Sequence, residues 1–92
     1  MPRFMIERNL PAGLDAGDID DAARRAVAVN ATMPGVRWLH SNLAVDRSKF
    51  FCEYEAPDGD SVQEAARRAE IPCDTVTEVT LVAPEQYAGS RL

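Results

Sequence analysis

The sequence lacks a long hydrophobic run and, at its start, the pattern of a secretory signal. Nowhere do about 18 apolar residues follow one another, which is the length that a transmembrane helix needs. Pro2, Arg3, Glu7 and Arg8 interrupt the apolar residues near the start, so no cleavable leader is expected there. These absences predict a soluble, cytoplasmic protein that has no membrane partner.

Cysteine and basic charge are also scarce. Cys52 and Cys73 lack the close spacing of a redox or zinc motif, and Cys52 lies between aromatic residues, so we expect a reduced thiol in the core. The formal net charge is -5 and the isoelectric point is about 4.7. Because such a domain is repelled by phosphate backbones and anionic lipid surfaces, nucleic acid is not expected as a partner.

The chain has the length and composition of one small globular domain. Its 92 residues leave no room for a second core, and a hydrophobic content of 46% argues against disorder. We expect a single domain over residues 1–83, followed by a polar C-terminal tail over residues 84–92. A domain of this size buries only about two thirds of its unfolded surface, so association or a ligand often adds stability.

An internal repeat indicates the architecture. The pentapeptide Ala-Ala-Arg-Arg-Ala occurs at residues 22–26 and again at residues 65–69, and each copy lies between two strand-like segments. The chain is therefore predicted to form two strand-helix-strand halves. With right-handed crossovers these build a ferredoxin-like α+β fold, with an antiparallel sheet in the order 4-1-3-2 and both helices on one face.

The boundaries of the elements follow from turn and capping residues. Ser61 and Glu64 form the pattern of a capping box, so the second helix is expected to begin near residue 62. Strands are expected over residues 3–9, 36–45, 49–55 and 73–83, with helices from Asp15 or Asp18 to about residue 33 and over residues 62–70.

The sheet face without helices is predicted to be apolar enough for association. Side chains alternate across a strand, so each strand contributes one set to the helix side and one to the opposite side. The opposite set includes Met5, Trp38 and Phe51, with Val76 and Val82 beside them. This apolar surface is too large to remain in water on a small monomer, which predicts a homodimer through this face.

The same alternation places polar groups on that face. The repeat matches Glu7 with Glu53, and alignment of the strands that follow the two prolines matches His40 with Glu78. Neighbouring carboxylates resist desolvation unless a proton or a cation neutralises them. Oxygen and imidazole ligands suit nickel, cobalt, manganese, iron or zinc. The alternative is that these carboxylates are solvent-facing residues that pair with nearby arginines.

Several stretches resemble a family of small bacterial ferredoxin-like proteins, one branch of which is described as nickel-responsive and nickel-binding. They are Pro-Arg-Phe-Met-Ile-Glu-Arg at 2–8, Val-Arg-Trp-Leu-His-Ser at 36–41, and the segments 53–57 and 66–69. The similarity extends to about Val82. It implies a homodimer in which the helix-free faces meet and, in some members, a bound nickel ion. It does not say which residues are the ligands.

Two other functions remain open at this point. The chain could be a small enzyme of the dimeric α+β barrel type, a monooxygenase, isomerase or cyclase. Trp38, Phe51 and Met5 would then line a pocket in which His40 and Glu53 transfer protons. No nucleophile motif or phosphate-binding loop specifies a substrate. Alternatively, the helix-free face only forms a dimer, with the carboxylates at its rim.

Overall fold

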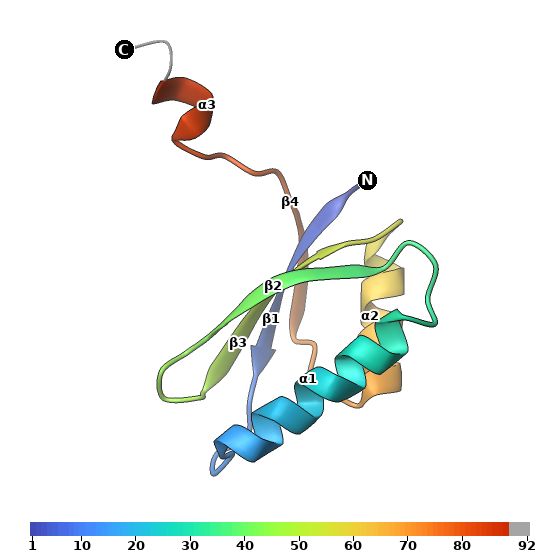
Figure 1. Ribbon diagram of the computed structural model, residues 1–92, viewed down its shortest axis with the longest axis vertical. Coiled ribbons are helices and arrows are strands. Elements are labelled where there is room, and N and C mark those ends of the chain that lie inside the picture. The colour runs from blue at the N-terminus through green and yellow to red at the C-terminus, as the bar shows by residue number, and fades with distance from the viewer. Residues whose placement is uncertain (89–92) are drawn as a thin grey trace.

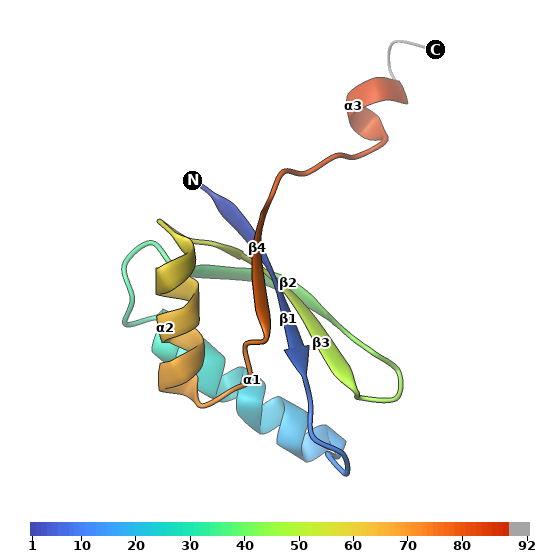
Figure 2. The same ribbon diagram turned by 180° about the vertical axis from the view of Figure 1, so that it is seen from behind.

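The computed structural model describes residues 1–88 and shows one four-stranded antiparallel sheet (Figure 1). The spatial order is β2-β3-β1-β4, which confirms the predicted ferredoxin-like arrangement. Both long helices cover the same face of the sheet (Figure 2). The elements are β1 (Arg3–Asn9), α1 (Ala16–Asn30), β2 (Arg37–Leu43), β3 (Lys49–Glu55), α2 (Gly59–Ala69), β4 (Thr75–Val79) and α3 (Glu85–Ala88).

Acidic N-caps set the start of both long helices. Asp15 and Asp18 form a reciprocal capping box, in which the Asp18 backbone N–H donates to Asp15 Oδ1 at 2.9 Å. In α2 the cap is Asp58, not the predicted Ser61, so the helix begins three residues earlier than expected. The Ser61 hydroxyl and backbone N–H both donate to Asp58 Oδ1 at 2.8 Å. These two hydrogen bonds lower the pKa of Asp58.

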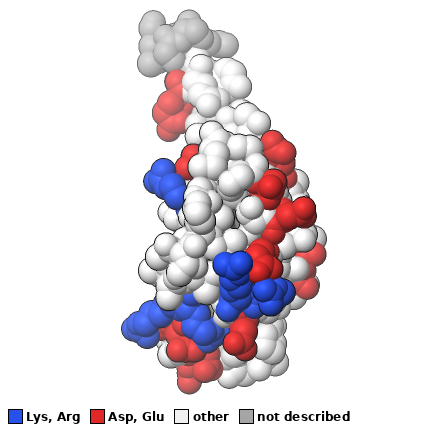
Figure 3. Space-filling model, turned by 90° about the vertical axis from the view of Figure 1, so that its right-hand side faces the viewer, with Lys and Arg blue, Asp and Glu red and all other residues white. Residues whose placement is uncertain are grey.

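The acidic residue before each repeated pentapeptide pairs with its arginines. Asp21 pairs with Arg25 on α1, and Glu64 accepts hydrogen bonds from Arg67 at 2.6 Å and Arg68 at 2.8 Å on α2. The arginine doublets therefore belong to solvated helix faces with mixed charge. Figure 3 likewise shows acidic and basic side chains intermingled on one side of the molecule.

Replacing Glu64 by glutamine is expected to destabilise the protein at neutral pH but not at strongly acid pH. Hydrogen bonds from Arg67 and Arg68 lower the pKa of Glu64 from 4.5 to about 2. A depressed folded-state pKa stabilises the protein above pH 4.5 and ceases to do so as the pH falls through about 2. The difference in melting temperature between wild type and Glu64→Gln should therefore shrink across this interval.

Asp20→Asn is the matched control, because Asp20 has no ion-pair partner within residues 1–88. Thermal unfolding followed by circular dichroism at several pH values measures both variants. An equal difference for Glu64→Gln at pH 7 and at pH 2 would contradict the assignment.

The core lies between the sheet and the two helices. Ile6 and Val62 are the largest side chains that are almost fully buried, at 0% and 1% exposure. The buried alanines of the second repeat let α2 lie close to the strands. The remaining core is formed by Phe4, Ala26, Val36, Cys52, Tyr54, Ala56, Ala65, Ala66 and Ala69. Cys52 is a buried free thiol, as predicted, and Cys73 is a free thiol that is partly buried.

The repeat is visible in the strand register. Ile6 lies directly opposite Cys52, and on either side of this pair Met5 faces Glu53 while Glu7 faces Phe51. Because the repeat matches Ile6 with Cys52 and Glu7 with Glu53, the pseudo-two-fold axis passes through the Ile6–Cys52 pair. Each half therefore presents one glutamate on the sheet face without helices, here called the open face.

The chain leaves the domain earlier than predicted. β4 ends at Val79 instead of residue 83, and the following segment runs away from the sheet to the short helix α3 (Figures 1 and 2). Leu81 and Val82 are exposed on this arm. The predicted tail therefore contains α3, and its last residues, 89–92, lie outside the described part of the chain.

Candidate functional site

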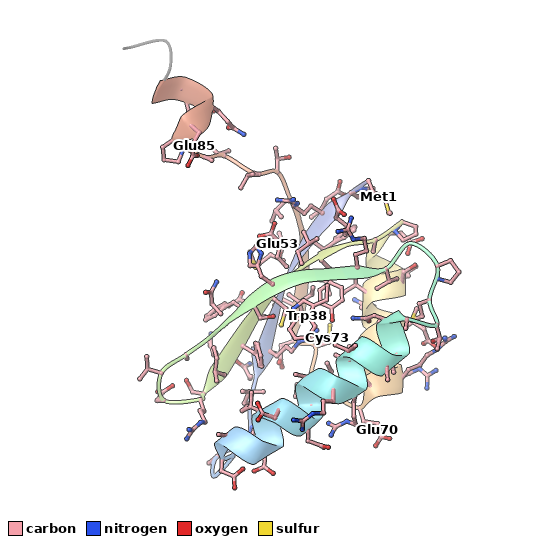
Figure 4. All side chains as sticks on the ribbon, viewed as in Figure 1. Met1, Trp38, Glu53, Glu70, Cys73 and Glu85 are labelled. Atoms are coloured by element: carbon pink, nitrogen blue, oxygen red, sulfur yellow. The ribbon has the colours of Figure 1, made fainter. Side chains whose placement is uncertain are left out.

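Glu53 lies on the open face of β3, the strand that is flanked by β2 and β1. Its Oε2 is 2.9 Å from Arg3 Nη1, and its Oε1 is 3.6 Å from His40 Nε2. The Glu53 side chain is only 11% exposed, whereas the His40 imidazole is 61% exposed. Figure 4 shows Glu53 on the side of the sheet away from α1. An oriented carboxylate thus lies beside an imidazole that solvent and solutes can reach.

Glu7 occupies the equivalent place in the other half of the repeat. Lys49 Nζ lies 3.7 Å from its Oε1, and the Thr75 hydroxyl donates to its Oε2 at 3.3 Å. The repeat matches Lys49 with Arg3, so the two ion pairs are related by the pseudo-two-fold axis. Glu7 has threonine where Glu53 has histidine, and its side chain is 42% exposed. Only the Glu53 half therefore combines a carboxylate with an imidazole.

The predicted placement of Glu78 on this face is wrong. In β4 Thr75 pairs with Glu7 and Val76 with Ile6, which puts Val76 and Glu78 on the helix side. The structural counterpart of His40 is Thr75, since each is opposite the glutamate of its own half. His40 is six residues after Pro34, whereas Thr75 is only three residues after Pro72. Matching the two prolines therefore displaces β4 by three residues relative to β2. Because three is odd, the side chains of β4 are assigned to the wrong faces of the sheet.

Trp38 is also on the helix side, contrary to prediction, and Val36 just before β2 is buried in the core. Trp38 pairs with Tyr54 and His40 with Glu53, so one extra residue, Leu39, forms a bulge between them. Trp38 packs against the core (Figure 4). Its Nε1 donates to Ser41 Oγ at 2.7 Å.

Met5 and Phe51 remain on the open face, opposite Glu53 and Glu7. The pocket predicted from Trp38, Phe51 and Met5 therefore has its members on two sides of the sheet. This removes the lining on which the enzyme alternative depended.

The open face brings together only two of the four predicted metal ligands, His40 and Glu53. Within residues 1–88 no group of three or more histidine, cysteine, aspartate or glutamate side chains is close enough to share an ion. His40 and Glu53 are the two candidates that lie together, and their imidazole and carboxylate donors fit a divalent transition metal. The 3.6 Å between His40 Nε2 and Glu53 Oε1 is shorter than the sum of two coordination bonds of about 2.1 Å each, so one ion can reach both atoms. Among the predicted ligands, one chain therefore offers two donors that a single ion could share.

The fold and this face define a small α+β protein of the ferredoxin-like class. A sequence model of the "Nickel responsive protein SCO4226-like" family matches residues 4–79, and the chain belongs to this family. None of the helices within residues 1–88 has the length and apolarity to cross a bilayer.

Two solved structures share the fold of this chain. The crystal structure of SCO4226 from Streptomyces coelicolor A3(2) is 23% identical and has a TM-score of 0.77, covering 88% of this chain and 99% of that one. A putative antibiotic biosynthesis monooxygenase from Chloroflexus aurantiacus J-10-fl is 14% identical with a TM-score of 0.54, covering 89% of this chain and 93% of that one. At these identities the similarity shows the fold alone. No curated protein matches the chain by sequence.

Proposed function

We propose that this protein binds a divalent transition metal, nickel in preference to others, through His40 and Glu53 on the open face. The observation that carries the proposal is the placement of His40 Nε2 3.6 Å from Glu53 Oε1, in a chain whose family is described as nickel responsive. The role is metal sequestration or a metal response in the cytoplasm. Glu78 is not a member of this ligand set, because it lies on the helix side.

Arg3 prepares Glu53 for this role. It contacts Oε2 and leaves Oε1 directed toward His40. A residue that pairs with a metal ligand without touching the metal fixes the orientation of that ligand before the metal binds. Glu7 has no imidazole neighbour, so we assign it a weaker role as a nearby negative charge that attracts the cation.

A homodimer through the open face would complete the site. A two-fold axis brings the same surface of each chain together, so every ligand from one protomer is matched by its copy. The face suits such contact because Met5, Phe51 and Val79 are only half-buried, while Arg3 and Lys49 are already paired with acidic groups. Two copies supply two imidazoles and two carboxylates, which are donors that nickel accepts.

Nickel is expected to raise the melting temperature of the chelator-treated protein, and His40→Ala is expected to abolish most of that rise. At a free nickel concentration about 100 times the Kd, binding adds about 2.7 kcal/mol. For a domain of this size that corresponds to roughly 10–20 °C. Differential scanning calorimetry measures the shift, and sedimentation velocity with and without nickel measures the mass of the dimer.

Asn42→Ala is the matched control, since Asn42 is exposed and follows His40 on the same face of β2. It should retain the nickel response of the wild type. Magnesium, which prefers oxygen ligands and keeps its own water, should leave the wild-type melting temperature unchanged. An unchanged melting temperature with nickel, cobalt, manganese and zinc would refute the proposal.

A further inference from the structure

A cavity of about 400 Å³ lies on the other side of the sheet, between α1, β3 and the segment that leads into β4. This volume is within the range of small-molecule sites. Its walls are mainly apolar and include Ile19, Ala22, Trp38, Phe50, Ile71 and Pro72. Figure 4 shows Trp38 on the helix side of the sheet, where the cavity lies, and Glu53 on the opposite side. The cavity is thus separate from the proposed metal site.

The cavity contains one buried cation, Arg8, which is only 3% exposed. Arg8 Nη1 donates to the Pro72 carbonyl oxygen at 2.6 Å and Nε donates to Cys52 Sγ at 3.4 Å. Within residues 1–88 no carboxylate lies at ion-pairing distance from its guanidinium. Burial of a charge is costly unless an opposite charge compensates it. Arg8 therefore provides a strong attraction for an anionic ligand group.

Tyr54 adds a second polar group to the same cavity. Burial raises the pKa of Tyr54, and hydrogen bonds with Asn30 and Arg8 act in the opposite direction. Asn30 Nδ2 donates to the Tyr54 hydroxyl oxygen at 3.2 Å, so that hydroxyl can itself donate to a ligand oxygen. One guanidinium and one phenol in an apolar enclosure match the head group of an organic acid.

The charged side chains that line the cavity favour a ligand with one negative charge over a ligand with two. Asp21 is paired with Arg25, whose Nε also donates to the Ala69 carbonyl oxygen at 2.8 Å. Asp18 and Glu70 also line the cavity, so its three carboxylates outnumber Arg8 and Arg25. These carboxylates would repel a phosphate ester with two negative charges more strongly than a monocarboxylate.

We infer that this cavity binds a small amphipathic monocarboxylic acid, with the carboxylate on Arg8 and the apolar part against Trp38, Phe50 and Ile19. A bidentate contact of a guanidinium with a carboxylate is strong and directional. The apolar walls contribute in proportion to the ligand surface that they remove from water. This site is independent of nickel binding and of the homodimer.

Decanoate is the probe, and decanol, which has the same chain without the charge, is its comparison. Trp38 is the single tryptophan and lines the cavity, so its fluorescence reports binding of either molecule. Saturable binding of decanoate, at least tenfold tighter than decanol, is expected for the wild type. Arg8→Met should bring the two affinities within about twofold, while Arg24→Met, at an exposed arginine of α1, should leave the wild-type ratio unchanged.

A second pair of variants tests the cavity should Arg8→Met fail to fold. Ala22→Phe fills the space from α1 and should weaken decanoate binding at least tenfold, whereas Ala28→Phe, at an exposed position of the same helix, should not. Nickel binding should remain intact in Ala22→Phe. Equal affinity of the wild type for decanoate and decanol, absence of saturable binding, or unchanged decanoate binding in Ala22→Phe would each overturn the inference.

Discussion

Replacing Glu53 by glutamine is expected to weaken nickel binding at least tenfold, which corresponds to about 1.4 kcal/mol or more. The glutamine keeps the shape of the side chain but removes the negative charge that faces His40 at 3.6 Å. Because the Glu53 side chain is only 11% exposed, water cannot readily take the place of the lost carboxylate as a partner for the metal ion. Isothermal titration calorimetry with nickel and chelator-treated protein measures the change in Kd.

Two other glutamates provide matched controls for this experiment. Glu78→Gln should leave nickel affinity unchanged, since Glu78 is on the helix side of β4. Glu7→Gln should produce a smaller loss than Glu53→Gln, because Glu7 has Thr75 beside it in place of an imidazole. A loss with Glu78→Gln equal to that with Glu53→Gln would contradict the site, and so would a Glu53→Gln variant with wild-type affinity.

The architecture could be predicted because the repeat and the hydrophobic pattern agree. The matching of residues 3–7 with 49–53 predicts that β1 and β3 are equivalent, and the observed register centres on Ile6 and Cys52 as this equivalence requires. Glu7 and Glu53 therefore fall on the open face as predicted. Both strands are regular, so simple alternation assigns every side chain to the correct face.

The outer strands could not be assigned in the same way. A bulge at Leu39 adds one residue to β2, and alternation counted back from His40 then places Trp38 on the wrong face. In β4 fewer residues separate Pro72 from Thr75 than separate Pro34 from His40 in β2. Matching the prolines therefore assigns Glu78 to the open face, although it lies on the helix side. A shift of one residue changes the face of every side chain in a strand, so small irregularities have large consequences for a site.

Arg8 was the most important residue that sequence reasoning missed. The charge of its side chain predicts an exposed position on the surface. Its position in β1 points the other way, because it alternates with Phe4 and Ile6, which are both in the core. A charged residue in phase with core residues is the signal that could have identified the buried cation.

Replacing Ile6 by alanine is expected to lower the free energy of unfolding by about 2–5 kcal/mol. Ile6 is 0% exposed and lies between Cys52 on β3 and Val76 on β4, at the pseudo-two-fold axis. Truncation of the Ile6 side chain to that of alanine leaves a cavity that the well-packed neighbours on both sides cannot readily fill. Urea unfolding followed by circular dichroism measures the loss at a fixed protein concentration.

Val45→Ala is the control, because Val45 is fully exposed at 102% in the hairpin between β2 and β3 and should change stability by no more than about 0.5 kcal/mol. A loss below 1 kcal/mol for Ile6→Ala would contradict the central packing of Ile6. Ile6 adjoins Glu7 in sequence but points to the opposite face of β1. Under conditions where Ile6→Ala remains folded, its nickel affinity should therefore match the wild type, which distinguishes a loss of packing from a loss of ligands.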